Sequence, residues 1–174
     1  MGLLRHRDRD QEAPPAGVYW MRERMLAIGD DYWIENGAGE RTFKVDGKAL
    51  RLRSTLAFED TSGHELLRIQ ERKLRVRDTM VIERDGDTVA TVRKALVTPL
   101  RERFKIELTA GGDYDVRGNV VDHEYTFARA GREVARVSKR WFRVRDTYGV
   151  EIEPGEADVL VLAATVAIDQ MTHS

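Results

Sequence analysis

The stretch Gly63–Glu83, GHELLRIQERKLRVRDTMVIE, recurs without a gap as Gly131–Glu151, GREVARVSKRWFRVRDTYGVE. The two copies lie 68 residues apart, and ten of their 21 paired positions are identical. The identical positions include all of Arg75–Thr79 against Arg143–Thr147, and several other pairs exchange one apolar side chain for another. A duplication of this length predicts a fold built from two similar halves.

Short runs of alternating apolar and polar residues occupy most of the chain between Asp31 and Glu153. Turn residues such as Asn36-Gly37, Asp85-Gly86 and Gly111-Gly112 separate these runs. Such dipeptides indicate hairpins, because the favoured two-residue turns need positive φ angles. About ten to twelve short strands at this spacing predict an all-β barrel or sandwich.

The C-terminal segment has a different pattern. After Pro154-Gly155 comes a run of about 16 residues, and a helix there would be apolar on all sides between Val159 and Ile168, apart from Thr165. A membrane span needs about 20 apolar residues, which this run does not reach. An all-round apolar helix that does not span a membrane is enclosed by protein. We therefore predict a C-terminal helix that fills the interior of the β structure.

The domain organisation follows from length and composition. Residues 1–17 are charged and contain prolines, with few apolar side chains to offset the entropy of ordering, so they predict a flexible leader. Residues 18–174 are expected to form a single domain. Leu3 and Leu4 are followed at once by charged residues, which does not match a secretory signal. We expect a cytoplasmic protein, peripheral to the membrane if it binds lipid.

Composition excludes several functional classes. The chain has no cysteine, which rules out disulfides, thiol nucleophiles and thiolate metal sites. Acidic and basic residues nearly cancel, 30 against 29, for a formal net charge of −1. A general polycation for nucleic acid is therefore not predicted, and any anion binding must come from a local basic patch.

Several motifs together carry a family resemblance. They are Phe43–Lys48, Leu74–Thr79, Gly118–Tyr125, Val137–Val150 and the Ala-, Val- and Leu-rich C-terminal helix. Through them the chain resembles the LURP-one-related family over about residues 21–172, and that family is similar in fold to tubby C-terminal domains and phospholipid scramblases. The resemblance implies a mainly β (α+β) fold, a closed antiparallel barrel of about twelve strands around the C-terminal helix. Tubby domains bind phosphoinositide headgroups through basic surface residues, so the resemblance also suggests an anionic ligand.

Basic residues recur at alternate positions of the expected strands, which places them on one face. Arginine guanidinium groups bind phosphate in a bidentate manner, so neighbouring basic strands can hold a phosphorylated headgroup. A simpler interpretation is that these residues are ordinary outward positions paired with nearby glutamates such as Glu65 and Glu107. The candidate anion-binding residues are Lys73, Arg75, Arg77, Arg101, Arg103, Lys139, Arg140, Arg143 and Arg145.

Acidic residues and a histidine suggest an enzymatic alternative. Asp78 and Asp146 occupy equivalent places in the two repeats, where a carboxylate commonly accepts backbone hydrogen bonds in a bend. His123 stands between Asp122 and Glu124 in what we expect to be an exposed strand. Side chains alternate along a strand, so these three residues cannot bind one metal ion there.

We therefore hypothesise a non-enzymatic binding or scaffold protein. Its expected partner is an anionic phospholipid headgroup, a membrane surface or another phosphorylated ligand on a basic barrel face, with a protein partner also open. The alternative is a hydrolase of small molecules or phosphate esters that uses Asp78, Asp146 or His123. No catalytic residue, metal or cofactor is assigned, and the sequence does not define the oligomeric state.

Overall fold

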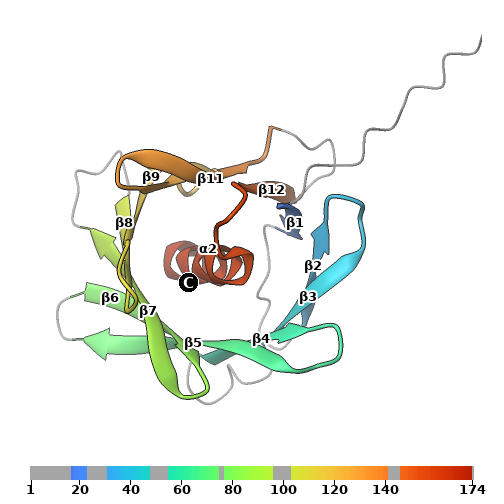
Figure 1. Ribbon diagram of the computed structural model, residues 1–174, viewed down its shortest axis with the longest axis horizontal. Coiled ribbons are helices and arrows are strands. Elements are labelled where there is room, and N and C mark those ends of the chain that lie inside the picture. The colour runs from blue at the N-terminus through green and yellow to red at the C-terminus, as the bar shows by residue number, and fades with distance from the viewer. Residues whose placement is uncertain are drawn as a thin grey trace, which may run out of the picture.

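In the part of the chain that the computed structural model describes, twelve antiparallel strands form a closed barrel around a C-terminal helix (Figure 1). The structure describes residues 17–22, 31–47, 55–74, 77–95, 103–140 and 146–173, without the side chains of residues 73, 74, 77, 78 and 173. The elements are β1 Val18–Arg22, β2 Tyr32–Asn36, β3 Arg41–Asp46, β4 Thr55–Asp60, β5 Glu65–Leu74, β6 Arg77–Arg84, β7 Asp87–Ala95, β8 Arg103–Leu108, β9 Tyr114–Asn119, β10 Glu124–Arg129, β11 Arg132–Ser138, β12 Thr147–Ile152 and α2 Asp158–His173.

Each strand pairs with the next one along the chain, and β1 pairs with β12 to close the wall. The closing register runs from Val18 opposite Glu151 to Arg22 opposite Thr147. Closure leaves no unpaired strand edge for another chain to pair with. The prediction of a closed, mainly β barrel of about twelve strands is confirmed.

The barrel interior is filled by α2 and by every second side chain of the wall. In β4, for example, Leu56 and Phe58 are fully buried while their neighbours are half-buried. All residues from Val161 to Asp169 of α2 are buried, and Figure 1 shows the helix along the barrel axis with the strands around it. The prediction of a helix enclosed by protein is therefore confirmed.

The sequence repeat maps onto two hairpins, β5–β6 and β11–β12, that are six strands apart in a wall of twelve. The two copies therefore lie on opposite sides of the barrel. They repeat the same ion pair, Glu65–Arg68 at 2.9 Å and Glu133–Arg136 at 2.8 Å. Because this pair occurs in both halves, it belongs to the repeated architecture.

Polar contacts hold the N-terminal end of α2. The Tyr19 hydroxyl donates a hydrogen bond to Asp158 Oδ2 at 2.6 Å. The Tyr114 hydroxyl donates to Glu156 Oε2 at 3.0 Å, and Arg129 Nη2 lies 3.3 Å from the same oxygen. These contacts fix the position of the helix along the barrel axis.

The predicted leader lies almost wholly outside the described residues. Its last residue, Gly17, accepts a hydrogen bond from the Ile152 backbone N–H at 2.8 Å. Among the described helices, none is long and apolar enough to cross a membrane.

Candidate functional site: an arginine-lined groove

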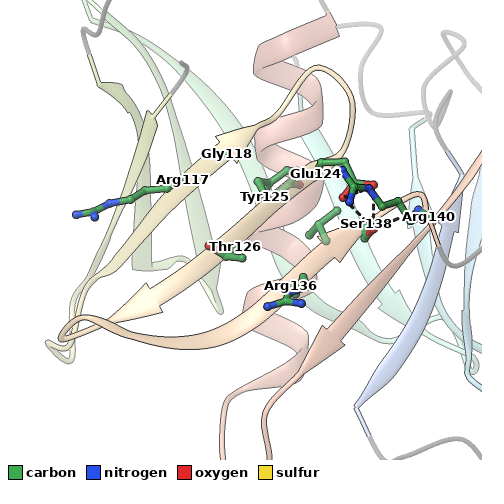
Figure 2. Close-up of a pocket in the computed structure, with 9 residues that line it drawn as sticks. Arg117, Gly118, Glu124, Tyr125, Thr126, Arg136, Ser138 and Arg140 are labelled. Carbon is green, nitrogen blue, oxygen red and sulfur yellow. Dashed lines mark hydrogen bonds and ion pairs between the residues drawn. The ribbon is translucent and has the colours of Figure 1, made fainter. Parts of the chain in front are cut away.

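An open groove of about 490 Å³ lies on the outer face of β9, β10 and β11 (Figure 2). We call it the arginine groove. The side chains that define it are Arg117, Glu124, Thr126, Arg136, Ser138 and Arg140. It has a basic lining with one carboxylate and two hydroxyl groups, all supplied by the second half of the repeat.

Strand register explains why arginines from separate strands meet here. Arg117 of β9 lies opposite Thr126 of β10, and Thr126 lies opposite Arg136 of β11. On the other side of β9, Arg117 lies opposite Arg103 of β8. Directly paired residues point to the same face of a sheet, so Arg103, Arg117 and Arg136 share one lateral row on the outside of the barrel.

Two of these arginines differ from Arg136, which pairs with Glu133. Arg103 and Arg117 are both exposed, and within the described part of the chain neither guanidinium has an ion-pair partner. Like charges directly opposite each other across two strands are destabilising. A bound anion between them would relieve this repulsion.

A second group of contacts surrounds Glu124. The Ser138 hydroxyl lies 2.9 Å from both carboxylate oxygens, and the Lys139 backbone N–H donates to Oε1 at 3.0 Å. Arg140 Nε lies 3.7 Å from Oε2, and the Arg140 side chain is 84% exposed. In Figure 2 Arg117 points away from this group, so the groove has two separate polar regions.

The first half of the barrel provides an internal comparison. Its corresponding row runs Asp46, Ala57, Arg68, Glu83, against Arg117, Thr126, Arg136, Glu151 in the second half. The Arg68–Glu83 and Arg136–Glu151 positions match at the repeat distance of 68 residues. At the first position an aspartate is replaced by an arginine, which reverses the charge. The arginine groove is therefore specific to the second half and is not required by the shared architecture.

The nine candidate anion-binding residues fall into two groups: three lie in or beside the groove, and the side chains of the other six lie outside the described residues. Arg140 lines the groove, Arg103 lies beside it, and Lys139 contributes its backbone N–H. Of the other predicted residues, the side chains of Lys73 and Arg77 and the whole of Arg75, Arg101, Arg143 and Arg145 lie outside the described residues.

Arg117 and Arg136 were missed by the sequence analysis. A signal for Arg117 was present, because Lys44–Gly47 matches Asp115–Gly118 and the charge at the third position differs between the two segments. The simpler interpretation, ordinary ion pairing with glutamates, holds elsewhere on the barrel. Glu65 pairs with Arg68, and Glu107 pairs with Arg93 at 3.4 Å.

His123 corrects one expectation. It does not lie on an exposed strand but ends the β9–β10 turn, with a left-handed φ of 52°, and it is 2% exposed. Its Nε2 lies 3.2 Å from Oδ1 of the buried Asp169 on α2, and its ring stacks on Tyr148 with 4.3 Å between centroids. The turn reverses the direction of the chain and brings the imidazole into the barrel interior.

Tyrosine hydroxyl groups complete this buried cluster at the C-terminal end of α2. The Tyr148 hydroxyl donates a hydrogen bond to Asp169 Oδ2. Burial, and then the charge of Asp169, raise the pKa of Tyr148 and of Tyr125 well above the ordinary value. The cluster therefore fixes the far end of the helix, and His123 is not accessible to a substrate.

The other residues of the enzymatic alternative do not form a site with His123. Asp146 is exposed in a turn with a φ of 62°, and the side chain of Asp78 lies outside the described residues. Among the described histidines, aspartates and glutamates, no group of three or more is arranged to hold a metal ion.

Comparisons with known proteins agree with this architecture. The model of the family described as LURP-one-related matches residues 18–169. The chain is 25% identical to the uncharacterized protein YxjI of Bacillus subtilis (strain 168), over 89% of this chain and 93% of that protein. An X-ray structure of a protein from Arabidopsis thaliana shares the fold with a TM-score of 0.63 and 16% identity, over 88% of this chain and 89% of that one.

Proposed function

The chain belongs to the LURP-one-related family, and we propose that it is a non-enzymatic binding protein whose arginine groove takes a phosphate-bearing ligand, such as an anionic phospholipid headgroup. The observation that carries this proposal is the row of Arg103, Arg117 and Arg136. Its first two members face each other across β8 and β9 without an ion-pair partner in the described part of the chain.

The chemistry of the groove suits a phosphate group. Guanidinium groups form charge-assisted hydrogen bonds with phosphate oxygens and match their geometry. Thr126, in the same row, adds a hydroxyl that can donate to a phosphate oxygen. A volume of about 490 Å³ lies within the range of roughly 300–1,000 Å³ typical of small-ligand sites.

Vesicle binding by charge-removal variants tests the proposal. Co-sedimentation is measured with phosphatidylcholine vesicles, with and without phosphatidic acid, and glycerol 3-phosphate is titrated in parallel. The double variant Arg117→Gln/Arg140→Gln should bind phosphatidic acid vesicles about tenfold more weakly than the unaltered protein, because two charge-assisted contacts are lost. Binding should also weaken as salt rises, since the interaction is electrostatic.

The matched control is Arg68→Gln/Arg93→Gln, which removes the same charge from paired arginines outside the groove. It should bind like the unaltered protein. Affinity for glycerol 3-phosphate equal to that for the vesicles would identify a free phosphate ester as the ligand. Equal losses in the two double variants, or equal binding to both kinds of vesicle without binding of glycerol 3-phosphate, would refute the proposal.

A further inference from the structure

The carboxylate of Glu124 already occupies a set of anion-binding donors inside the arginine groove. Ser138 Oγ and the Lys139 backbone N–H lie at 2.9 and 3.0 Å from its oxygens, and Arg140 Nε lies at 3.7 Å. The Arg140 backbone N–H in turn donates to Ser138 Oγ at 3.1 Å, which orients the hydroxyl. A hydroxyl, a backbone N–H and a guanidinium that converge on one point form a site for an oxyanion.

These donors do not distinguish a carboxylate from a phosphate. Both ligands present negatively charged oxygens that accept the same hydrogen bonds. A phosphate that enters the groove near Arg136 therefore meets donors that are already bound to the protein's own carboxylate. Either the ligand leaves them unused or Glu124 must give them up.

We propose that Glu124 is a built-in competitor for the ligand phosphate, and that the site at Ser138, Lys139 N–H and Arg140 binds either the Glu124 carboxylate or the phosphate. This inference rests on the proposed function of the groove. When Glu124 occupies the donors, the apparent affinity falls in proportion to the fraction of molecules in which they are free. Because of this competition, a ligand binds only when its concentration or its negative charge is high enough to displace the Glu124 carboxylate, and molecules with little phosphorylation do not displace it.

Neighbouring residues allow the side chain to move while the backbone stays in place. His123 and Tyr125 on either side are 2% exposed and point into the barrel, where His123 contacts Asp169. The Glu124 side chain is 28% exposed. Its displacement needs only side-chain rotation toward solvent, without movement of β10.

The first half of the barrel lacks this arrangement. By strand register, Thr55 takes the place of Glu124 there, because Thr55 lies two residues before Ala57 as Glu124 lies two before Thr126. Thr55 lies opposite Gln70, which is equivalent to Ser138 at the repeat distance of 68 residues. A neutral residue thus takes the place of Glu124 in the first half, whereas Arg72 there corresponds to Arg140. What distinguishes the half with the arginine groove is the carboxylate itself.

The variant Glu124→Gln tests the inference, because it keeps the side-chain size and removes the charge. Inorganic phosphate is titrated by calorimetry, and phosphatidylcholine vesicles with and without phosphatidic acid by co-sedimentation. Glu124→Gln should bind phosphate about fivefold or more tightly than the unaltered protein, since the competitor is weakened. The control Glu65→Gln removes the same charge from the opposite side of the barrel and should leave the affinity unchanged. Circular dichroism shows that each variant is folded.

A second substitution shows whether the gain arises at the proposed donors. In Glu124→Gln/Ser138→Ala the affinity should return toward that of the unaltered protein, because one donor to the phosphate is lost. A gain that persists in the double variant, or that Glu65→Gln reproduces, would mean that only general electrostatics changed, and it would overturn the inference. If Glu124→Gln binds phosphate equally or more weakly, while binding still depends on Arg117 and Arg140, Glu124 is not a competitor. The proposal that the arginine groove binds phosphate would then still stand. If neither the unaltered protein nor Glu124→Gln binds phosphate or vesicles, both proposals fall.

Discussion

Gly118 is the position where the packing of the groove leaves no room for a side chain. Its φ of 137° lies outside the range that L residues adopt readily, and a Cβ there would lie 2.4 Å from the Glu124 carbonyl oxygen and 2.7 Å from Tyr125 Cα. The glycine thus lets β9 approach β10 where Glu124 faces the groove and Tyr125 faces the interior. Gly86 also has a positive φ, 89°, but a Cβ there would have no atom within 4 Å.

The substitution Gly118→Ala should therefore destabilise the fold far more than Gly86→Ala. The control carries only the left-handed backbone penalty of about 1–2 kcal/mol, whereas Gly118→Ala must in addition move β9 away from β10. Urea denaturation of both variants measures the difference. Equal losses in the free energy of unfolding would show that β9 and β10 separate without resistance, contrary to the packing described.

Residue-scale detail was only partly predictable. Arg103 became a candidate because alternation along a strand predicts which side chains share a face, and Arg140 because it flanks the basic positions Arg143 and Arg145. Arg117 and Arg136 join them through register between strands, which a single strand's pattern does not contain. His123 was placed on the wrong element. The residues Val120–His123 form a turn, and the sequence analysis missed the signal of its turn-forming residues Asn119 and Asp122, which hydrogen-bond to each other.

Helix α2 shows at the element scale why an all-round apolar segment is stable here. Leu162 is fully buried among strands of the wall, while Leu160, nearer the helix start, is half-buried. The barrel supplies apolar contacts in every direction around the central turns, and the polar contacts of Asp158 and Asp169 mark the two ends. Burial at the centre is therefore the main contribution of this helix to stability.

The substitution Leu162→Ala should lower the free energy of unfolding by about 2–5 kcal/mol, because it removes buried methyl groups and leaves a cavity. Leu160→Ala makes the same chemical change at a position with more solvent contact, so its loss should be clearly smaller. Chemical denaturation monitored by circular dichroism compares the two. A larger loss for Leu160→Ala would place the tightest packing at the helix start rather than in its middle.

At the scale of the whole molecule, burial changes the titration of every tyrosine. The chain has five tyrosines, and burial is the largest cause of a raised pKa in all of them, with the pKa of Tyr114 raised to about 12. In the unfolded chain tyrosine loses its proton near pH 10. Above that pH the unfolded state binds fewer protons than the folded state, so the free energy of unfolding decreases as pH rises.

Alkaline titration should therefore show tyrosine ionisation and unfolding together, at a pH above 10, and no effect of these groups on stability below about pH 9. Ultraviolet absorbance of tyrosinate and circular dichroism, recorded on the same samples, check this. The protein unfolded in urea serves as the reference and should ionise near pH 10. Ionisation at that pH with the circular dichroism unchanged would contradict the burial of the tyrosines.

The architecture was more predictable than the site. The sequence repeat, the alternation of apolar and polar residues and the apolar C-terminal helix are each visible in local sequence, and together they indicate a β structure that encloses the helix. That this structure is a closed barrel was implied by the family resemblance. The groove depends on which residues of different strands lie opposite each other, and on a charge reversal between Asp46 and Arg117. The polar cluster of His123, Tyr148 and Asp169 joins three distant parts of the chain, so no local pattern indicates it.

Helix α2, which fills the barrel, follows all twelve strands in the sequence, and this order has a consequence for biosynthesis. A ribosome makes all twelve strands before it makes the residues of α2 that occupy the space between them. Until then the inward apolar side chains have no partner along the axis, and the pairing of β1 with β12 joins segments more than a hundred residues apart. Such nascent chains expose apolar surface for longer than proteins with local contacts do. A nascent chain that lacks α2 is therefore expected to aggregate more readily than the finished protein.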